Sequence, residues 1–242
     1  MAKRLTKNLG IGFCLYRNNS KRNKVMKMRF EQIDYPVPYL EDNRFRALLG
    51  SKKWNLLPHA IQHRFGKRVQ GGASVTYQGI VTRMQMNLAG RILSQLARAI
   101  GAPLPFDPAC INRPAVVVVT EDAASDGQFW IRQYGRSIGF PQIVHSSKRF
   151  AGPTGLEEHI GYRIGMALRV DAKENALVFK SDHYFLALGH TRIRLPRILV
   201  PGQLEIRHED LGNHEFNFSL RLHSNLFGLL IRHEAVFKDA QA

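Results

Sequence analysis

The sequence predicts an α+β, mainly-β domain: a curved antiparallel sheet or partial barrel of about eight to nine strands, with a few helices near its start. From Ala115 to Phe237, apolar residues recur at every second position far more often than at every third or fourth. Only a sheet places such rows on one side. Short turns join the strands, and a sheet of this size needs closure or a covering layer because open edges aggregate.

The first 34 residues are set apart by their charge. They contain nine basic and two acidic residues, whereas the whole chain of 242 residues has a net charge of +16. We expect residues 1–34 to form a basic, flexible leader. Tyr35-Pro36-Val37-Pro38 then opens a single domain, 35–242, because each proline disfavours helix in the residue before it.

Helical spacing is confined mainly to residues 41–101. Apolar residues recur at helical intervals in 41–50, and Ile61 with Phe65 indicates a second short helix. A longer helix is expected over 86–100. Its apolar stripe, which we expect to pack on the sheet, consists of Leu88, Ile92, Leu93, Leu96 and Ile100.

The strands follow in chain order. Residues 115–121 and 128–134 flank the hairpin turn Asp126-Gly127, and the clearest alternation runs from His159 to Val170 as one strand. Further strands are expected over residues 69–84, 137–145, 177–188, 204–208, 216–222 and 226–237. On the core side we place Tyr162, Ile164, Leu168, Phe216, Phe218 and Leu220.

Four stretches resemble a bacterial domain family of unknown function: Leu56-Leu57-Pro58 to Phe65, Gly90-Arg91-Ile92-Leu93 to Pro105, Trp130 to Ser146, and Gly189 to Pro201. The resemblance covers roughly residues 40–238. Members of that family occur alone or attached to saccharopine-dehydrogenase-like NAD(P)-binding domains, which implies association with an oxidoreductase. The resemblance carries over no catalytic residue. No G-x-G-x-x-G follows a strand here, so we expect no dinucleotide bound by that motif and no cofactor.

Arginines on the polar rows of the strands are the candidates for ligand binding. If those rows line a concavity, their guanidinium groups would orient a carboxylate or a phosphate; if they face solvent, they only confer solubility. The candidates are Arg132, Arg163, Arg169, Arg192, Arg194 and Arg221.

Histidines near carboxylates are the candidates for acid–base chemistry. Adjacent residues of a strand point to opposite faces, so His183 and Asp182 are not expected to form a pair. Any such pair must form between strands, which leaves the catalytic residues unknown. His59 and His63 have the spacing of a zinc-binding helix, but Ala60 replaces the catalytic Glu of H-E-x-x-H, and we expect no metal.

The leading hypothesis is a binding module rather than an enzyme, whose partly basic sheet holds an anionic amphipathic small molecule such as a lipid. One alternative is an enzyme or accessory domain that acts on a small anionic substrate through an inter-strand His and carboxylate. Another is binding of nucleic acid or of an anionic membrane surface by the basic leader, with nucleic acid ranked below the pocket. We expect a cytoplasmic location because no secretory signal or apolar span is evident, with peripheral attachment to a membrane left open.

Overall fold

The computed structural model describes residues 39–99, 101, 104–189 and 191–239; the expected leader, 1–34, lies outside the described residues. Most of the described chain forms one antiparallel barrel. Its strands are β3 (Ser74–Met86), β4 (Pro114–Asp122), β5 (Gly127–Tyr134), β6 (Gln142–Arg149), β7 (Glu157–Gly161), β8 (Ile164–Lys173), β9 (Ala176–Leu188), β11 (Gln203–Gly212), β12 (Glu215–Ser224) and β13 (Gly228–Lys238). A further strand, β10 (Thr191–Arg194), pairs with the end of β9.

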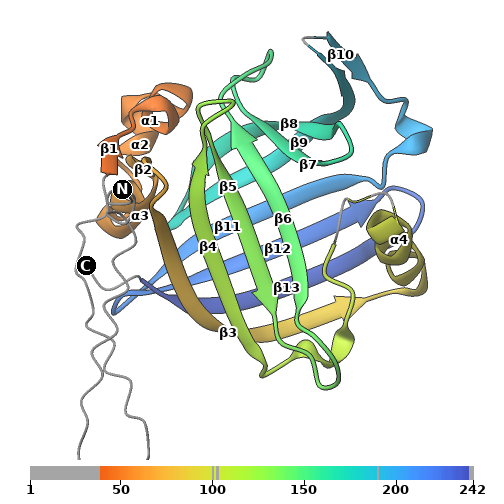
Figure 1. The fold of residues 1–242 in the computed structure, drawn as a ribbon. Coiled ribbons are helices and arrows are strands. Elements are labelled where there is room, and N and C mark those ends of the chain that lie inside the picture. Colours follow the sequence, from red (N-terminus) through yellow and green to blue (C-terminus); the bar gives the residue numbers. More distant parts are fainter. Residues whose placement is uncertain (1–38, 100, 102–103, 190, 240–242) are drawn as a thin grey trace, which may run out of the picture. The chain divides into compact units, whose positions relative to one another are not determined.

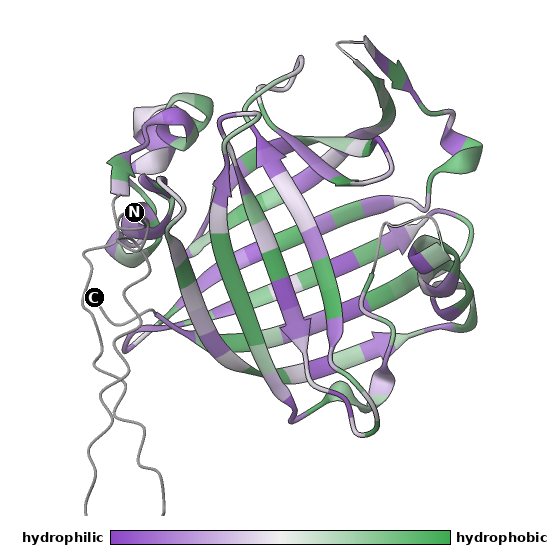
Figure 2. Cartoon of the chain, in the orientation of Figure 1, coloured by the Kyte–Doolittle hydropathy of each residue, from purple (hydrophilic) through white to green (hydrophobic). Residues whose placement is uncertain are grey.

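The ten strands close in the order β9-β11-β12-β13-β3-β4-β5-β6-β7-β8, and β8 pairs back onto β9 (Figure 1). This closure confirms the predicted fold class. Hydrophilic and hydrophobic residues alternate along the strands (Figure 2), so one row fills the interior and the other faces outward. Leu168, Phe216, Phe218 and Leu220 are buried, as predicted.

The segment expected as one strand from His159 to Val170 is two strands joined by a tight turn. Gly161 pairs with Ile164, and the residues between them, Tyr162 and Arg163, have φ angles of 36° and 65°. Tyr162 is 73% exposed, so its predicted place in the core was wrong. Two-residue hairpins favour Asn-Gly, and Tyr-Arg gives no such signal; a left-handed backbone at each costs on the order of 1 kcal/mol.

Three short helices and a two-stranded sheet lie at one end of the barrel (Figure 1). They are α1 (Arg44–Leu49), α2 (Ser51–Trp54), α3 (His59–Phe65), and the antiparallel pair β1 (Tyr39–Glu41) and β2 (Lys67–Val69). Phe45 and Phe65 are buried and lie edge-on or tilted against Phe179 of the barrel at ring distances of 5.9 and 5.8 Å. These helices therefore share one core with the barrel.

The longer helix, α4 (Leu88–Ala99), lies on β13 through its small residues. A Cβ on Gly90 would come within 2.1 Å of the Leu230 carbonyl oxygen, so the close approach requires glycine. Ser94 and Ala97 are also buried, whereas Leu88 and Ile92 are 74% and 54% exposed. The prediction that the large apolar stripe packs on the sheet was wrong for Leu88, Ile92 and Leu96, because the narrow face of the helix permits the closer contact; Leu93 is partly buried against the core, and Ile100 lies outside the described residues.

Helices in the described part are otherwise limited to two 3₁₀ turns, Pro108–Cys110 and Arg197–Leu199. This agrees with the prediction that helices are confined mainly to residues 41–101. None of the helices described is both long and apolar enough to cross a membrane.

Candidate functional site

Three charged side chains lie inside the barrel, on neighbouring strands. Arg132 comes from β5, Lys148 from β6 and Glu158 from β7, and each is at most 5% exposed. Lys148 and Glu158 are register partners across the β6–β7 pair, which places their side chains next to each other on the inward face. The rows that supply the core thus also supply a charged cluster.

A single carboxylate oxygen serves the whole cluster. Glu158 Oε1 lies 3.0 Å from Lys148 Nζ and 3.8 Å from Arg132 Nη2, and it accepts a hydrogen bond of 2.6 Å from the Ser146 hydroxyl. Arg132 Nη1 donates to the same hydroxyl at 3.2 Å. Arg132 Nε and Glu158 Oε2 are buried and have no hydrogen-bond partner among the residues that the structure describes. Two cations therefore share one anion.

The pKa values of the pair reflect this balance. Burial raises the pKa of the Glu158 carboxyl, but Lys148, Arg132 and the Ser146 hydroxyl together outweigh that effect and hold the pKa below its usual value. Burial is the largest effect on the pKa of Lys148 and lowers it despite the attraction of Glu158. The carboxylate stays ionised, while the lysine would gain from a second anion.

Aromatic rings and neutral histidines surround the cluster. The Arg132 guanidinium lies 5.3 Å from the centre of the Phe218 ring, and Lys148 Nζ lies 5.4 Å from that of Trp130. Burial, with a smaller effect of Arg132, lowers the pKa of His233 to about 4, and burial also lowers that of His208 well below its usual value. Both imidazoles are therefore neutral at pH 7, and neither ring nitrogen of His233 has a hydrogen-bond partner within the described part of the chain.

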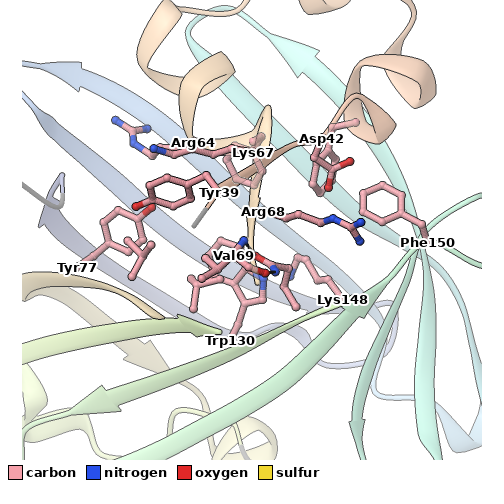
Figure 3. Close-up of a pocket in the computed structure, with 15 residues that line it drawn as sticks. Tyr39, Asp42, Arg64, Lys67, Arg68, Val69, Tyr77, Trp130, Lys148 and Phe150 are labelled. Carbon is pink, nitrogen blue, oxygen red and sulfur yellow. Dashed lines mark hydrogen bonds between the residues drawn. The ribbon is translucent and has the colours of Figure 1, made fainter. Parts of the chain in front are cut away.

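A cavity of about 40 Å³ leads from the helix-covered end of the barrel to Lys148 and Trp130 (Figure 3). Phe65 and Tyr77 line its wall, and burial raises the pKa of the Tyr77 hydroxyl to about 12, so that this hydroxyl stays protonated. A cavity of this size has room for a small polar group such as a carboxylate.

Basic side chains surround the mouth of this cavity. Arg64 is paired with Asp239 at 2.5 Å, and Arg68 is paired with Asp126. Lys67 Nζ instead lies 4.0 Å from the centre of the Tyr39 ring, and burial lowers its pKa. Figure 3 shows Arg64, Lys67 and Arg68 around the entrance, with Lys148 at its inner end. Aspartates thus balance much of the charge of Arg64 and Arg68, and an anion approaching Lys148 passes Lys67.

The structure does not bring the six predicted arginines together. Arg132 alone of the six is inside the barrel. Arg169 is 72% exposed and pairs with Asp182 at 2.6 Å, and Arg221 is 46% exposed and lies 4.0 Å from Glu234. Arg163 and Arg192 line a groove on the outer surface, and Arg194 is exposed on β10. The alternation in the sequence predicts which residues share a face of a strand, but it does not predict which of the two faces lies inside the barrel.

The outer groove has a volume of about 350 Å³ and lies where β10 approaches β7. Arg192 Nε donates to both oxygens of Glu157 at 3.0 and 3.1 Å, and His159 Nε2 lies 2.9 Å from Glu157 Oε2. Nearby, the buried Asp122 accepts hydrogen bonds from Ser147 and Arg149. These carboxylates lie beneath the groove, each matched by an arginine.

Two expectations about histidines were wrong. The pair of His159 and Glu157 lies along one strand, two residues apart on the same face, rather than between strands. His183 Nδ1 lies 2.8 Å from Asp182 although the two are adjacent. The register shifts at this point, where Asp182 is the extra residue of a β-bulge, and a bulge breaks the alternation of faces.

Sequence reasoning missed Lys148, and it considered Glu158 and His233 only among the histidines and carboxylates of the strands, without placing them in one cluster. A signal for Lys148 was available: Val144, Ser146 and Lys148 continue one period-two row, but the expected strand ended at His145. Alternation also gave a signal for Glu158, which shares a period-two row with the apolar Leu156 and Ile160, whereas Glu157 shares its row with His159; the expected strand began only at His159.

The described residues give little support for a metal site or for a cysteine nucleophile. No group of three or more His, Cys, Asp and Glu side chains converges there as a metal site would require. Burial, the largest effect, and Asp107 raise the pKa of the Cys110 thiol to about 11, which disfavours the thiolate that a nucleophile needs.

Comparison with known families covers the same part of the chain as the barrel. The sequence model of the family Domain of unknown function (DUF4166) matches residues 57–237, from just before α3 into β13. A search of curated proteins finds no match. The match extends over well more than half of the 242 residues. The chain therefore belongs to this family of domains of unknown function.

Proposed function

We propose that the protein is a binding module that takes the anionic group of a small amphipathic molecule into the barrel, next to Lys148 and with Arg132 behind it. One observation carries this proposal: two buried cations share one carboxylate inside the barrel. A buried charge without a counter-ion is unfavourable by several kcal/mol, and a carboxylate or phosphate oxygen would supply the missing charge and accept from the ammonium group.

The walls of the cavity support an amphipathic rather than a purely ionic ligand. Aromatic side chains, including Phe45, Phe65 and Trp130, lie between the mouth and Lys148. A volume of about 40 Å³ accommodates the head group but no long acyl chain. The apolar part of the ligand is therefore short or ring-shaped and lies against the mouth, where Lys67 and Tyr39 meet.

The test uses benzoate and inorganic phosphate as probes in calorimetric titrations of the full chain. Lys148→Met should weaken the binding of both by about tenfold or more, since a charge-assisted hydrogen bond of roughly 1.5–3 kcal/mol is lost. Arg221→Met removes an arginine from the outer face and serves as the matched control, with unchanged binding expected. Equal affinities for wild type and Lys148→Met, or weakening by Arg221→Met alone, would contradict the proposal.

We further propose, on the family resemblance alone, that the domain works beside a saccharopine-dehydrogenase-like NAD(P)-binding protein. Co-elution of this chain with such a protein from the same organism in size-exclusion chromatography would support the association. Separate elution at micromolar concentrations of both would count against it.

A further inference from the structure

The two ends of the barrel differ in the connections that they carry. Because all neighbouring strands are antiparallel, successive connections alternate between the ends. The end opposite α1–α3 has five connections, whose described residues we call the α4 rim: 87–99, 101, 104–113, 135–141, 162–163, 189, 191–202 and 225–227. Figure 1 shows α4 on this end, away from the helices that cover the cavity mouth.

Large apolar side chains project from the α4 rim into solvent. Phe140 and Ile198 are each 91% exposed, and Leu226 is 86% exposed. The apolar stripe of α4 also faces outward, with Leu88 and Leu96 at 74% and 61%. These residues come from four different connections, so the exposure belongs to the whole end of the barrel. Exposed apolar side chains gathered in this way mark a contact surface.

The charged residues of the α4 rim are almost all basic. Its five connections contain eight arginines, no lysine and a single acidic residue, Asp107, which gives a net charge of +7. That one aspartate is paired with Arg136 at 3.0 Å. Arg91 on α4 and Arg197 beside Ile198 are exposed. This end of the barrel therefore combines exposed apolar tips with guanidinium groups.

We propose that the α4 rim docks on an anionic lipid bilayer, with the apolar tips inserted among the head groups and the arginines on lipid phosphates. A bilayer surface combines negative charge with an apolar layer a few ångströms deeper, and each feature of the rim matches one of them. A nucleic acid would use the arginines but would leave Leu88, Ile198 and Leu226 in water. The tips therefore favour the membrane.

This docking fixes the orientation of the cavity. The mouth beneath β1 and β2 is at the opposite end of the barrel, so it faces the aqueous phase when the rim is on the bilayer. Membrane docking thus does not depend on the ligand inside the barrel. It also goes beyond the expected role of the basic leader, because it assigns the surface to the folded domain.

Co-sedimentation of the full chain with vesicles tests the proposal. We expect binding to phosphatidylcholine–phosphatidylglycerol vesicles and little binding to pure phosphatidylcholine. The double replacement Leu226→Ser and Phe227→Ser should weaken binding by about tenfold or more, because it removes two apolar side chains whose transfer from water into the bilayer favours binding.

The double replacement Arg91→Gln and Arg197→Gln should also weaken vesicle binding and should flatten its salt dependence. Leu56→Ser, which removes a tip that is 69% exposed at the other end, is the matched control.

All the replaced side chains are exposed, so thermal unfolding should be nearly unchanged and will confirm that the variants fold. Wild-type affinity in the Leu226→Ser/Phe227→Ser variant would overturn the proposal and would assign any vesicle binding to the leader. Binding of an RNA oligonucleotide that responds to the arginine variants, together with vesicle binding that responds to neither pair, would identify a nucleic-acid surface instead and would equally overturn it.

Discussion

The interior cluster and the outer groove use the same types of side chain under different conditions. Inside, Arg132 and Lys148 share Glu158 among aromatic rings, and all three are nearly inaccessible to solvent. Outside, Glu157 is matched by Arg192, whose side chain is 29% exposed. Glu157 and Glu158 are neighbours in the chain, yet the strand sends them to opposite faces.

The comparison shows that charge balance matters most where water is excluded. In the groove the carboxylates are buried but the arginines are partly exposed, so water can solvate an arginine that loses its partner and the loss is smaller. In the barrel, the uncompensated cation interacts strongly with whatever anion can reach it. We therefore assign ligand binding to the interior, and the following predictions test this contrast in order of decreasing effect.

Glu158→Gln should lower the free energy of unfolding by about 3–5 kcal/mol, because it leaves two buried cations without a carboxylate. Arg132→Met is the matched control, because it removes a positive instead of a negative charge. It leaves a balanced Lys148–Glu158 pair and should change the free energy of unfolding far less. Urea unfolding at pH 7 measures both. Equal losses in the two variants would show that the interior has no excess positive charge.

Acidification should destabilise the protein through His233. Its pKa is lowered from 6.5 to about 4 by burial and, to a smaller extent, by Arg132. The unfolded chain therefore takes up a proton below pH 6.5 that the folded protein takes up only near pH 4. Stability present above pH 6.5 is lost as the pH falls, by about 2 kcal/mol between pH 7 and pH 5 from this residue alone.

Unfolding curves at pH 7 and pH 5 for wild type and His233→Asn measure this effect. The variant should lose less stability on acidification than wild type does. His208 contributes in the same direction, because burial also lowers its pKa, so some dependence on pH should remain. Parallel behaviour of wild type and variant would show that His233 is not buried in its neutral form.

Glu157→Gln in the outer groove should lower the free energy of unfolding by about 1–2 kcal/mol, less than Glu158→Gln next to it. The carboxylate is buried, but Arg192 can reach water after the change. Chemical denaturation of the two variants under identical conditions makes the comparison. A larger loss for Glu157→Gln would reverse the contrast between the two regions.

Arg169→Gln should change stability by no more than about 0.5 kcal/mol, because its pair with Asp182 is exposed to solvent. The same denaturation experiment measures it, and added salt should remove even this difference. A loss comparable to that of Glu158→Gln would mean that exposure does not decide the strength of these pairs.

The sequence predicts the class of fold because the spacing of apolar residues, which distinguishes strands from helices, can be seen within a short segment of the chain. It placed Phe216, Phe218 and Leu220 in the core correctly. It did not find the turn at Tyr162 and Arg163, where the residue types give no turn signal, and it joined β7 to β8. It also misjudged α4, because the contact depends on how closely Gly90 allows two backbones to approach.

The candidate site was predictable only in part. Arg132 was among the predicted ligand-binding residues, and the structure places it in the interior cluster. Its partners Lys148 and Glu158 come from β6 and β7, the next two strands along the chain, but the expected strand ended at His145 and so left Lys148 out. Period assigns a residue to one of two faces, whereas closure decides which face is enclosed.

The location of a bound anion tests the central claim most directly. A crystal grown with 4-bromobenzoate, at a concentration that saturates binding in solution, would reveal the bromine by its anomalous scattering. We expect a bromine peak in the cavity mouth near Tyr39 and Phe65, with the carboxylate within hydrogen-bond distance of Lys148 Nζ. A carboxylate found only on the outer arginines, with the barrel interior unchanged, would contradict it.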